Sequence, residues 1–141
     1  MKGGYLHRAM ARELVATLER LGARVWTEYP AGPGRRASAV DIYAELGGLR
    51  LVCEIELGPR RVLKDVRKAE VLEANLLLIV APTATATRAI RHRLRTSTES
   101  RVRVRVLPYG LSLKHLSQVF AVECGRDKKT SNLPPARRVR R

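Results

Sequence analysis

The chain has few aromatic residues and few cysteines, and both shortages narrow its possible roles. Phe, Trp and Tyr make up 4% of the 141 residues, so few rings are available on which the bases of a single strand could stack. The two cysteines, Cys53 and Cys124, lack metal-ligand spacing, and a chain of this length does not need disulfides to fold. We expect Cys53 to be a small core residue.

Long apolar runs are also missing. No stretch approaches the roughly 20 apolar residues that span a bilayer, and residues 1–6 lack the apolar core of a secretory signal. We therefore expect a soluble, cytoplasmic (intracellular) protein with no membrane partner. No phosphate loop of the G-x-x-x-x-G-K type is present, which argues against an NTPase.

Acidic residues are outnumbered by basic ones, 13 to 28, which gives a net charge of +15. Lys and Arg bind polyanions by displacing condensed counterions from phosphates, so nucleic acid is the favoured partner. An anionic membrane surface is less favoured, because no basic amphipathic helix carries large apolar anchors. A ribosomal or other RNA-binding protein would also have this charge.

Hydrophobic periodicity predicts one α/β domain over residues 1–125, in the element order αβββαβαβ, with a mixed β-sheet flanked by helices. A basic, flexible tail, with seven basic residues and one acid, is predicted over residues 126–141. The predicted elements are a helix over Tyr5–Leu21, strands over Arg24–Tyr29, Ser38–Leu46 and Leu49–Leu57, a helix from Pro59 to about Ala74, a strand over Leu76–Ala81, a helix over Thr85–Arg95, a strand over Arg101–Val106 and a further helix over Leu111–Phe120.

The clearest local feature is a hairpin around Gly47-Gly48. A two-residue glycine turn pairs residues whose numbers sum to 95, which places apolar side chains together on one face, from Leu46 with Leu49 to Val40 with Ile55. On the other face Asp41 lies opposite Glu54, with Cβ atoms about 5 Å apart.

Glu56 points the same way as Glu54, so the hairpin carries a cluster of three acids. Like charges directly opposite one another destabilise a sheet, and in so basic a chain such a cluster indicates a bound cation. Oxygen ligands of this kind suit Mg²⁺ or Mn²⁺, which activate water and neutralise charge on a phosphodiester. The alternative is three solvated acids on the polar face of an edge hairpin.

The segments Ala39-Val40-Asp41-Ile42 and Val52-Cys53-Glu54-Ile55-Glu56 resemble the Asp and Glu-x-Lys motifs of the PD-(D/E)xK nuclease superfamily. The element order is similar to its restriction-endonuclease-like core. Within the superfamily, roughly residues 10–81 resemble archaeal-type Holliday junction resolvases. The resemblance implies Mg²⁺-dependent cleavage of duplex or branched DNA by a homodimer, with metal ligands from Asp41, Glu54, the Ile55 backbone carbonyl and Glu56.

The chain departs from the family pattern at two positions. Glu56 stands where the family has its lysine, so Glu56 is either a third ligand or the base, and Lys64 or Lys68 of the next helix takes the lysine's role. Both lysines are equally well explained as exposed helix charges. The helix-borne acid of the resolvases falls near Ala11, which leaves Glu13 as an approximate substitute.

These departures leave two hypotheses open, a metal-dependent DNA endonuclease and a catalytically impaired DNA-binding module or partner subunit of the same fold. Arg35 and Arg36 precede Asp41 in a loop and could clamp a phosphate. The alternating arginines of the last strand either follow a DNA backbone or protect a sheet edge. His7, His92 and His115 show no ligand spacing and are expected to be surface or core residues. The candidate DNA-binding residues are Arg35, Arg36, Arg60, Arg61, Lys64, Lys68, Arg101, Arg103 and Arg105.

Overall fold

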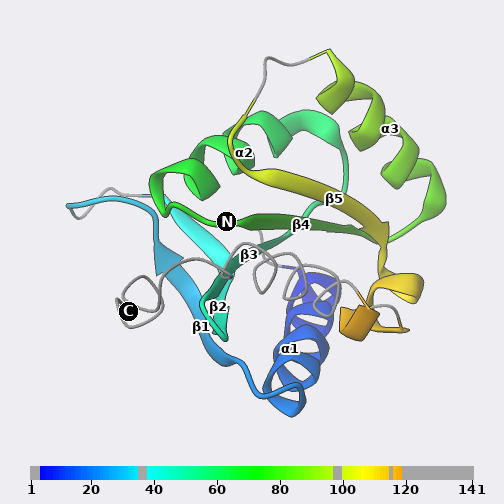
Figure 1. Cartoon of the computed structure of the whole chain (residues 1–141). Helices are drawn as coiled ribbons and strands as arrows, with labels where there is room; N and C mark the ends of the chain where they lie inside the picture. Colours follow the sequence, from blue (N-terminus) through cyan, green and yellow to red (C-terminus); the bar gives the residue numbers. More distant parts are fainter. Residues whose placement is uncertain (1–3, 35–37, 97–99, 115, 119–141) are drawn as a thin grey trace.

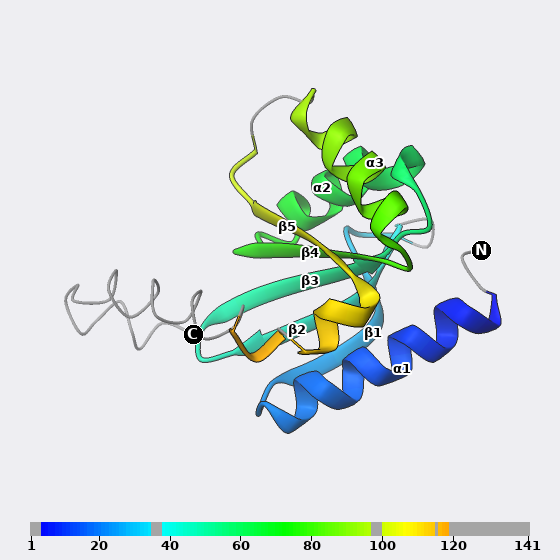
Figure 2. The same cartoon turned by 90° about the vertical axis from the view of Figure 1, so that its right-hand side faces the viewer.

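The computed structural model describes residues 4–34, 38–96, 100–114 and 116–118. A five-stranded sheet has helix α1 on one face and helices α2 and α3 on the other (Figures 1 and 2). The strands lie in the order β1-β2-β3-β4-β5, antiparallel from β1 to β3 and parallel from β3 to β5. The predicted α/β class with a mixed sheet is thus confirmed. The elements are α1 (Tyr5–Arg20), β1 (Arg24–Pro30), β2 (Ala39–Leu46), β3 (Leu49–Ile55), the 3-10 helix η1 (Pro59–Arg61), α2 (Val62–Val71), β4 (Leu76–Ala81), α3 (Ala84–Arg95) and β5 (Arg103–Pro108).

The core follows the apolar periodicity of the sequence. Strand β4 is buried at all six positions because both of its edges are paired and helices cover the sheet. Helix α1 buries Met10, Leu14 and Leu18 against the sheet, whereas Leu6, expected on the same face, is 53% exposed. No helix in the described part of the chain is long and apolar enough to cross a membrane.

The predicted boundaries of three elements need correction. The helix expected from Pro59 to Ala74 begins as the 3-10 turn η1, and α2 ends at Val71. Strand β5 begins at Arg103, because Val102 lies in a bend where its N–H donates to the Ser100 hydroxyl. The strand predicted to Leu57 ends at Ile55. Residues 109–114 and 116–118 are helical where Leu111–Phe120 was predicted, while residues 119–125 and the tail over 126–141 lie outside the described residues.

The glycine-turn register is confirmed from the pair Leu46 and Leu49 to the pair Ile42 and Cys53. Beyond that pair the pleat changes. Val40 packs on the α2 and α3 face of the sheet, whereas Ile42 packs on the α1 face. The prediction that Val40 shares an apolar face with Ile55 is therefore wrong. On the neighbouring strand Glu28 has a φ of 49°, so both strands deviate from regular pleating at this level.

Candidate functional site

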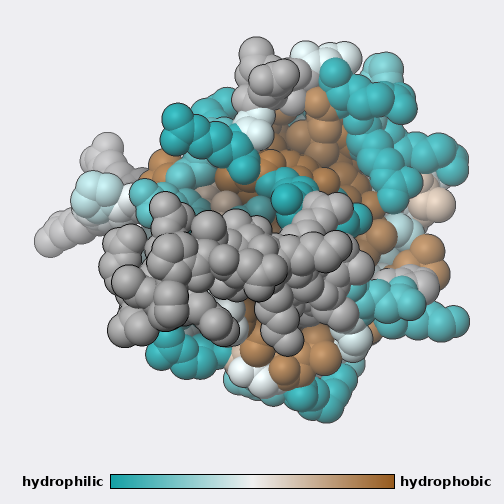
Figure 3. Space-filling view, in the orientation of Figure 1, coloured by the Kyte–Doolittle hydropathy of each residue, from teal (hydrophilic) through white to brown (hydrophobic). Residues whose placement is uncertain are grey.

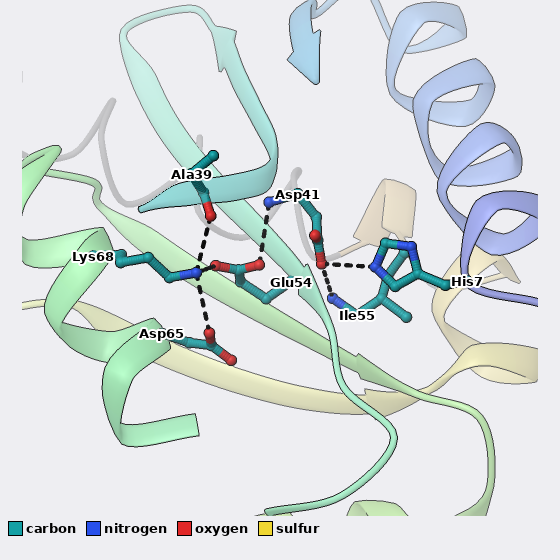
Figure 4. A network of polar contacts seen from close by, with 7 residues as sticks. All are labelled: His7, Ala39, Asp41, Glu54, Ile55, Asp65 and Lys68. Carbon is teal, nitrogen blue, oxygen red and sulfur yellow. Dashed lines mark hydrogen bonds and ion pairs between the residues drawn. The ribbon is translucent and has the colours of Figure 1, made fainter. Parts of the chain in front are cut away.

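Two acidic side chains bind backbone N–H groups where the β2–β3 ladder ends. Glu54 Oε1 accepts a hydrogen bond from the Asp41 N–H at 3.1 Å, and Asp41 Oδ2 accepts one from the Ile55 N–H at 2.8 Å (Figure 4). Asp41 and Glu54 are thus in contact, but the prediction that their carboxylates share one face is wrong. The Asp41 carboxylate points toward α1 and that of Glu54 toward α2, so Asp41 is not part of the cluster of carboxylates that could hold a metal. They meet through these reciprocal bonds to backbone, which a simple cross-strand pair would not form.

The Asp41 carboxylate also meets a histidine from the opposite layer. His7 Nε2, on α1, lies 3.3 Å from Asp41 Oδ2, and both side chains are 13% exposed. The break in pleating at Val40 accompanies this orientation of Asp41 toward α1 (Figure 4). The sequence does not indicate this contact, because a single histidine 34 residues before its partner carries no spacing signal.

A compact acidic cluster lies on the other side of Glu54. Carboxylate oxygens of Glu54, Glu56 and Asp65 lie within 4.8 Å of one another, and these residues are 0%, 4% and 1% exposed. Asp65, on α2, was not predicted. The spacing of the sequence could have indicated its burial, because Asp65 lies three residues after Val62 and four before Ala69, on the buried face of the helix.

Lys68 brings an ammonium group into this cluster from the next turn of α2. Its Nζ lies 2.8 Å from Glu54 Oε2 and 3.6 Å from Asp65 Oδ1, and it donates to the Ala39 carbonyl at 3.0 Å (Figure 4). Of the two lysines considered, the structure brings Lys68 to the acids, whereas Lys64 is exposed.

The donor set of this cluster fits a divalent cation. Glu54, Glu56 and Asp65 offer carboxylate oxygens close together, as hard cations require. Buried charges are costly unless they are paired or coordinate a metal. With all three carboxylates in the ionised form that binds metal, the cluster and Lys68 have two more negative charges than positive ones, so a divalent cation would bring these four residues to neutrality.

The remaining predicted site residues lie elsewhere. Glu13 is exposed on α1. The pKa of Tyr109 is raised mainly by burial and to a lesser extent by the negative charge of Glu13. Ile55 enters the network through its N–H, and a role for its carbonyl stays a prediction. Arg35 and Arg36 lie outside the described residues.

Of the other predicted DNA-binding residues, four are exposed, namely Arg60, Arg61, Arg101 and Arg103, and Arg105 is half-buried. On β5 the alternate residues Val104 and Val106 pack on the α2 and α3 face of the sheet. Side chains alternate along a strand, so Arg103 and Arg105 belong to the opposite face.

A second polar network lies at the turn end of the hairpin. The Tyr43 hydroxyl donates to Glu45 Oε2 at 2.8 Å, and Arg24 Nη2 lies 2.6 Å from Glu45 Oε1. The bond from Tyr43 lowers the pKa of Glu45, with help from Arg24, and burial raises the pKa of Tyr43. A surface pocket of about 580 Å³ opens beside this ion pair and does not include the acidic cluster.

Comparisons with protein-family models, with curated proteins and with solved structures found no match for this chain. Fold and geometry therefore define its class: an α/β protein in which β3 and α2 bring a lysine and three buried carboxylates together.

Proposed function

We propose that the protein is a divalent-metal-dependent DNA endonuclease of the PD-(D/E)xK type, acting on duplex or branched DNA. The observation that carries the proposal is the lysine that α2 inserts among the buried acids of β3. Glu56 stands where the PD-(D/E)xK nucleases have their lysine, and Lys68 of α2 supplies an ammonium group beside Glu54 in its place. The net charge of +15 supports a polyanionic substrate.

Each residue of the cluster has a distinct part in this proposal. Glu54, Glu56 and Asp65 hold Mg²⁺ or Mn²⁺, which supplies Lewis-acid stabilisation of the charge that develops on a phosphodiester. Asp41 orients Glu54 through its N–H and fixes the end of β3 through its carboxylate. Lys68, held by Glu54 and the Ala39 carbonyl, is in place to hold an attacking water or a phosphate oxygen.

The proposal is tested by incubating the protein with linear duplex and four-way-junction DNA in Mg²⁺ or Mn²⁺. We expect strand cleavage that chelation abolishes and that Glu54→Gln reduces by on the order of a hundredfold or more, because a metal ligand is lost. Glu73→Gln is the matched control, since Glu73 is an exposed acid on the same side of the sheet. Cleavage that persists in Glu54→Gln would contradict the assignment.

One observation favours a second candidate function, a DNA-binding module without turnover. The oxygens of Asp41 and Glu54 already accept N–H and ammonium donors, an arrangement that could be purely structural. This candidate predicts salt-sensitive DNA binding that Asp41→Ala leaves unchanged, with no cleavage of any substrate. Metal-dependent turnover would exclude it.

A further inference from the structure

Helix α3 differs from α1 and α2 in the distribution of its charge. It contains four arginines and one histidine and no acidic residue, whereas α1 and α2 each mix bases with acids. Like charges three or four residues apart destabilise a helix. The helix dipole favours Arg93 and Arg95 in the last turn, but it offers no such compensation to Arg88.

Three of the five basic side chains of α3 form a stripe on its outer face. Thr87 and Ile90 are buried against the sheet, and positions 85, 88, 89, 92 and 95 lie on the opposite half of the helix. All five are exposed. Arg88 lies 3.5 Å from the Thr85 hydroxyl and Arg95 lies 3.4 Å from His92 Nδ1, so the side chains follow one line along the axis. Hydrophilic side chains cover this part of the molecule in the space-filling view (Figure 3, upper right).

The stripe lies on the same side of the sheet as the acidic cluster. Helix α3 packs against η1. This 3-10 turn connects β3, which carries Glu54, to α2, which carries Lys68, and its residues Arg60 and Arg61 are exposed. The stripe contains no Phe, Tyr or Trp, the large rings on which bases stack, which favours contact with phosphates.

We propose that Arg88, His92 and Arg95 of α3 form a binding surface for the phosphodiester backbone of duplex nucleic acid. This surface deepens the proposed function, because it names the face on which that substrate lies. It was not among the predicted DNA-binding residues. Binding at α3 requires no metal and no cleavage, so the surface can be tested apart from the nuclease site.

The test measures the affinity of the protein for a 20-base-pair DNA duplex by fluorescence anisotropy, in chelator, over a series of salt concentrations. Two double variants are compared, Arg88→Gln with Arg95→Gln on α3, and Arg12→Gln with Arg20→Gln on α1. All four arginines are exposed on helices, and each pair removes two charges, so the effect of net charge is matched. Arginine and glutamine have similar helix propensities, so both variants should fold.

For the α3 variant we expect the slope of log K against log salt to become shallower by about 1.8, because each phosphate contact contributes about 0.9. The slope of the α1 variant should stay close to that of the wild type. Restoring the charge with Arg88→Lys and Arg95→Lys should restore the slope. A duplex RNA should show the same difference between variants, since the contacts are to the backbone.

Equal slope changes in the α1 and α3 variants would overturn the proposal, because general electrostatics would then explain binding. So would tight binding to anionic vesicles combined with no binding to duplexes. If the α3 variant behaves as expected and no substrate is cleaved, the surface stands and the nuclease assignment fails. If cleavage occurs but the slopes do not differ, only the surface is wrong.

Discussion

Lys68 brings a positive charge among the buried acids of β3 and α2. A lysine three residues after an aspartate on an amphipathic helix has the spacing of an exposed ion pair. In the structure its side chain is 11% exposed and contacts Glu54 of β3, whose side chain is fully buried. A buried pair of this kind is weak evidence for stability, but removing one partner leaves the other charge uncompensated. Substituting Lys68 can therefore distinguish a buried ion pair from a surface charge, because only loss of the buried pair leaves a carboxylate uncompensated in the interior.

We predict that Lys68→Met destabilises the metal-free protein by about 3 kcal/mol, because Glu54 and Asp65 lose the ammonium between them. Addition of Mg²⁺ or Mn²⁺ should recover part of this loss, since the cation then compensates the same carboxylates. Urea denaturation with and without the ion measures both effects. Lys64→Met, at an exposed position of α2, is the control and should change stability by less than about 0.5 kcal/mol. Equal stabilities of the two variants would contradict this role for Lys68.

Four of the six residues that form the site were named from the sequence, namely Asp41, Glu54, Glu56 and Lys68, and two were not. Strand alternation places Glu54 and Glu56 correctly on one face, but it placed Asp41 there too, whereas the break in pleating turns Asp41 toward α1. Asp65 and His7 were missed because their positions depend on how α2 and α1 pack on the sheet, which periodicity alone does not give. Extending the hairpin register past Ile42 failed because Asp41 and Glu54 bond to backbone there in place of the regular ladder.

At the scale of the elements, β1 and β2 form the antiparallel edge of the sheet and carry a ring cluster of their own. Tyr29 and Tyr43 stack with centroids 4.6 Å apart, and Trp26 packs against both. The hydroxyl of Tyr43 ties this cluster to Glu45. This edge of the sheet is thus stabilised by rings and an ion pair.

We predict that the Tyr43–Glu45 bond makes stability depend on pH at the acid end. The folded-state pKa of Glu45 lies below its ordinary 4.5, so its contribution is present above that pH and is lost as the pH falls through the folded value. Melting temperature should fall more between roughly pH 6 and 3 in the wild type than in Tyr43→Phe, which lacks the donor. Tyr29→Phe removes a hydroxyl from the same stack and should retain the wild-type dependence. Parallel curves for all three proteins would refute the coupling.

The existence of the helices and strands was predicted more accurately than the residues at which they begin and end. Alternation and apolar runs locate β2, β3 and β4 well because these strands are buried and their pattern is set by the core. The ends of α2 and β5 were misplaced, since Pro59 starts a 3-10 turn and Ser100 holds a bend before the strand. Such ends are decided by single hydrogen bonds, which hydrophobic periodicity does not register.

On the scale of the whole molecule, the protein separates two kinds of charge. Three acids gather in a buried cluster where β3 meets α2, while α3 presents an exposed stripe of bases on the same side of the sheet. A homodimer, implied by the resemblance to the resolvases, stays a prediction at this scale. In the proposed function the buried cluster and the exposed stripe serve one substrate, since a phosphodiester needs cations along its backbone and a cation-holding site at the bond to be cut.

The most direct measurement is a calorimetric titration of the protein with Mn²⁺ in the absence of DNA. We predict one ion per chain, with affinity lowered by on the order of tenfold or more in Glu54→Gln and in Asp65→Asn, and unchanged in Glu73→Gln. Asp41→Asn should weaken binding less than Asp65→Asn, because the Asp41 N–H that orients Glu54 is retained. A wild-type protein that binds no Mn²⁺, or one whose binding Glu54→Gln leaves intact, would contradict the central claim.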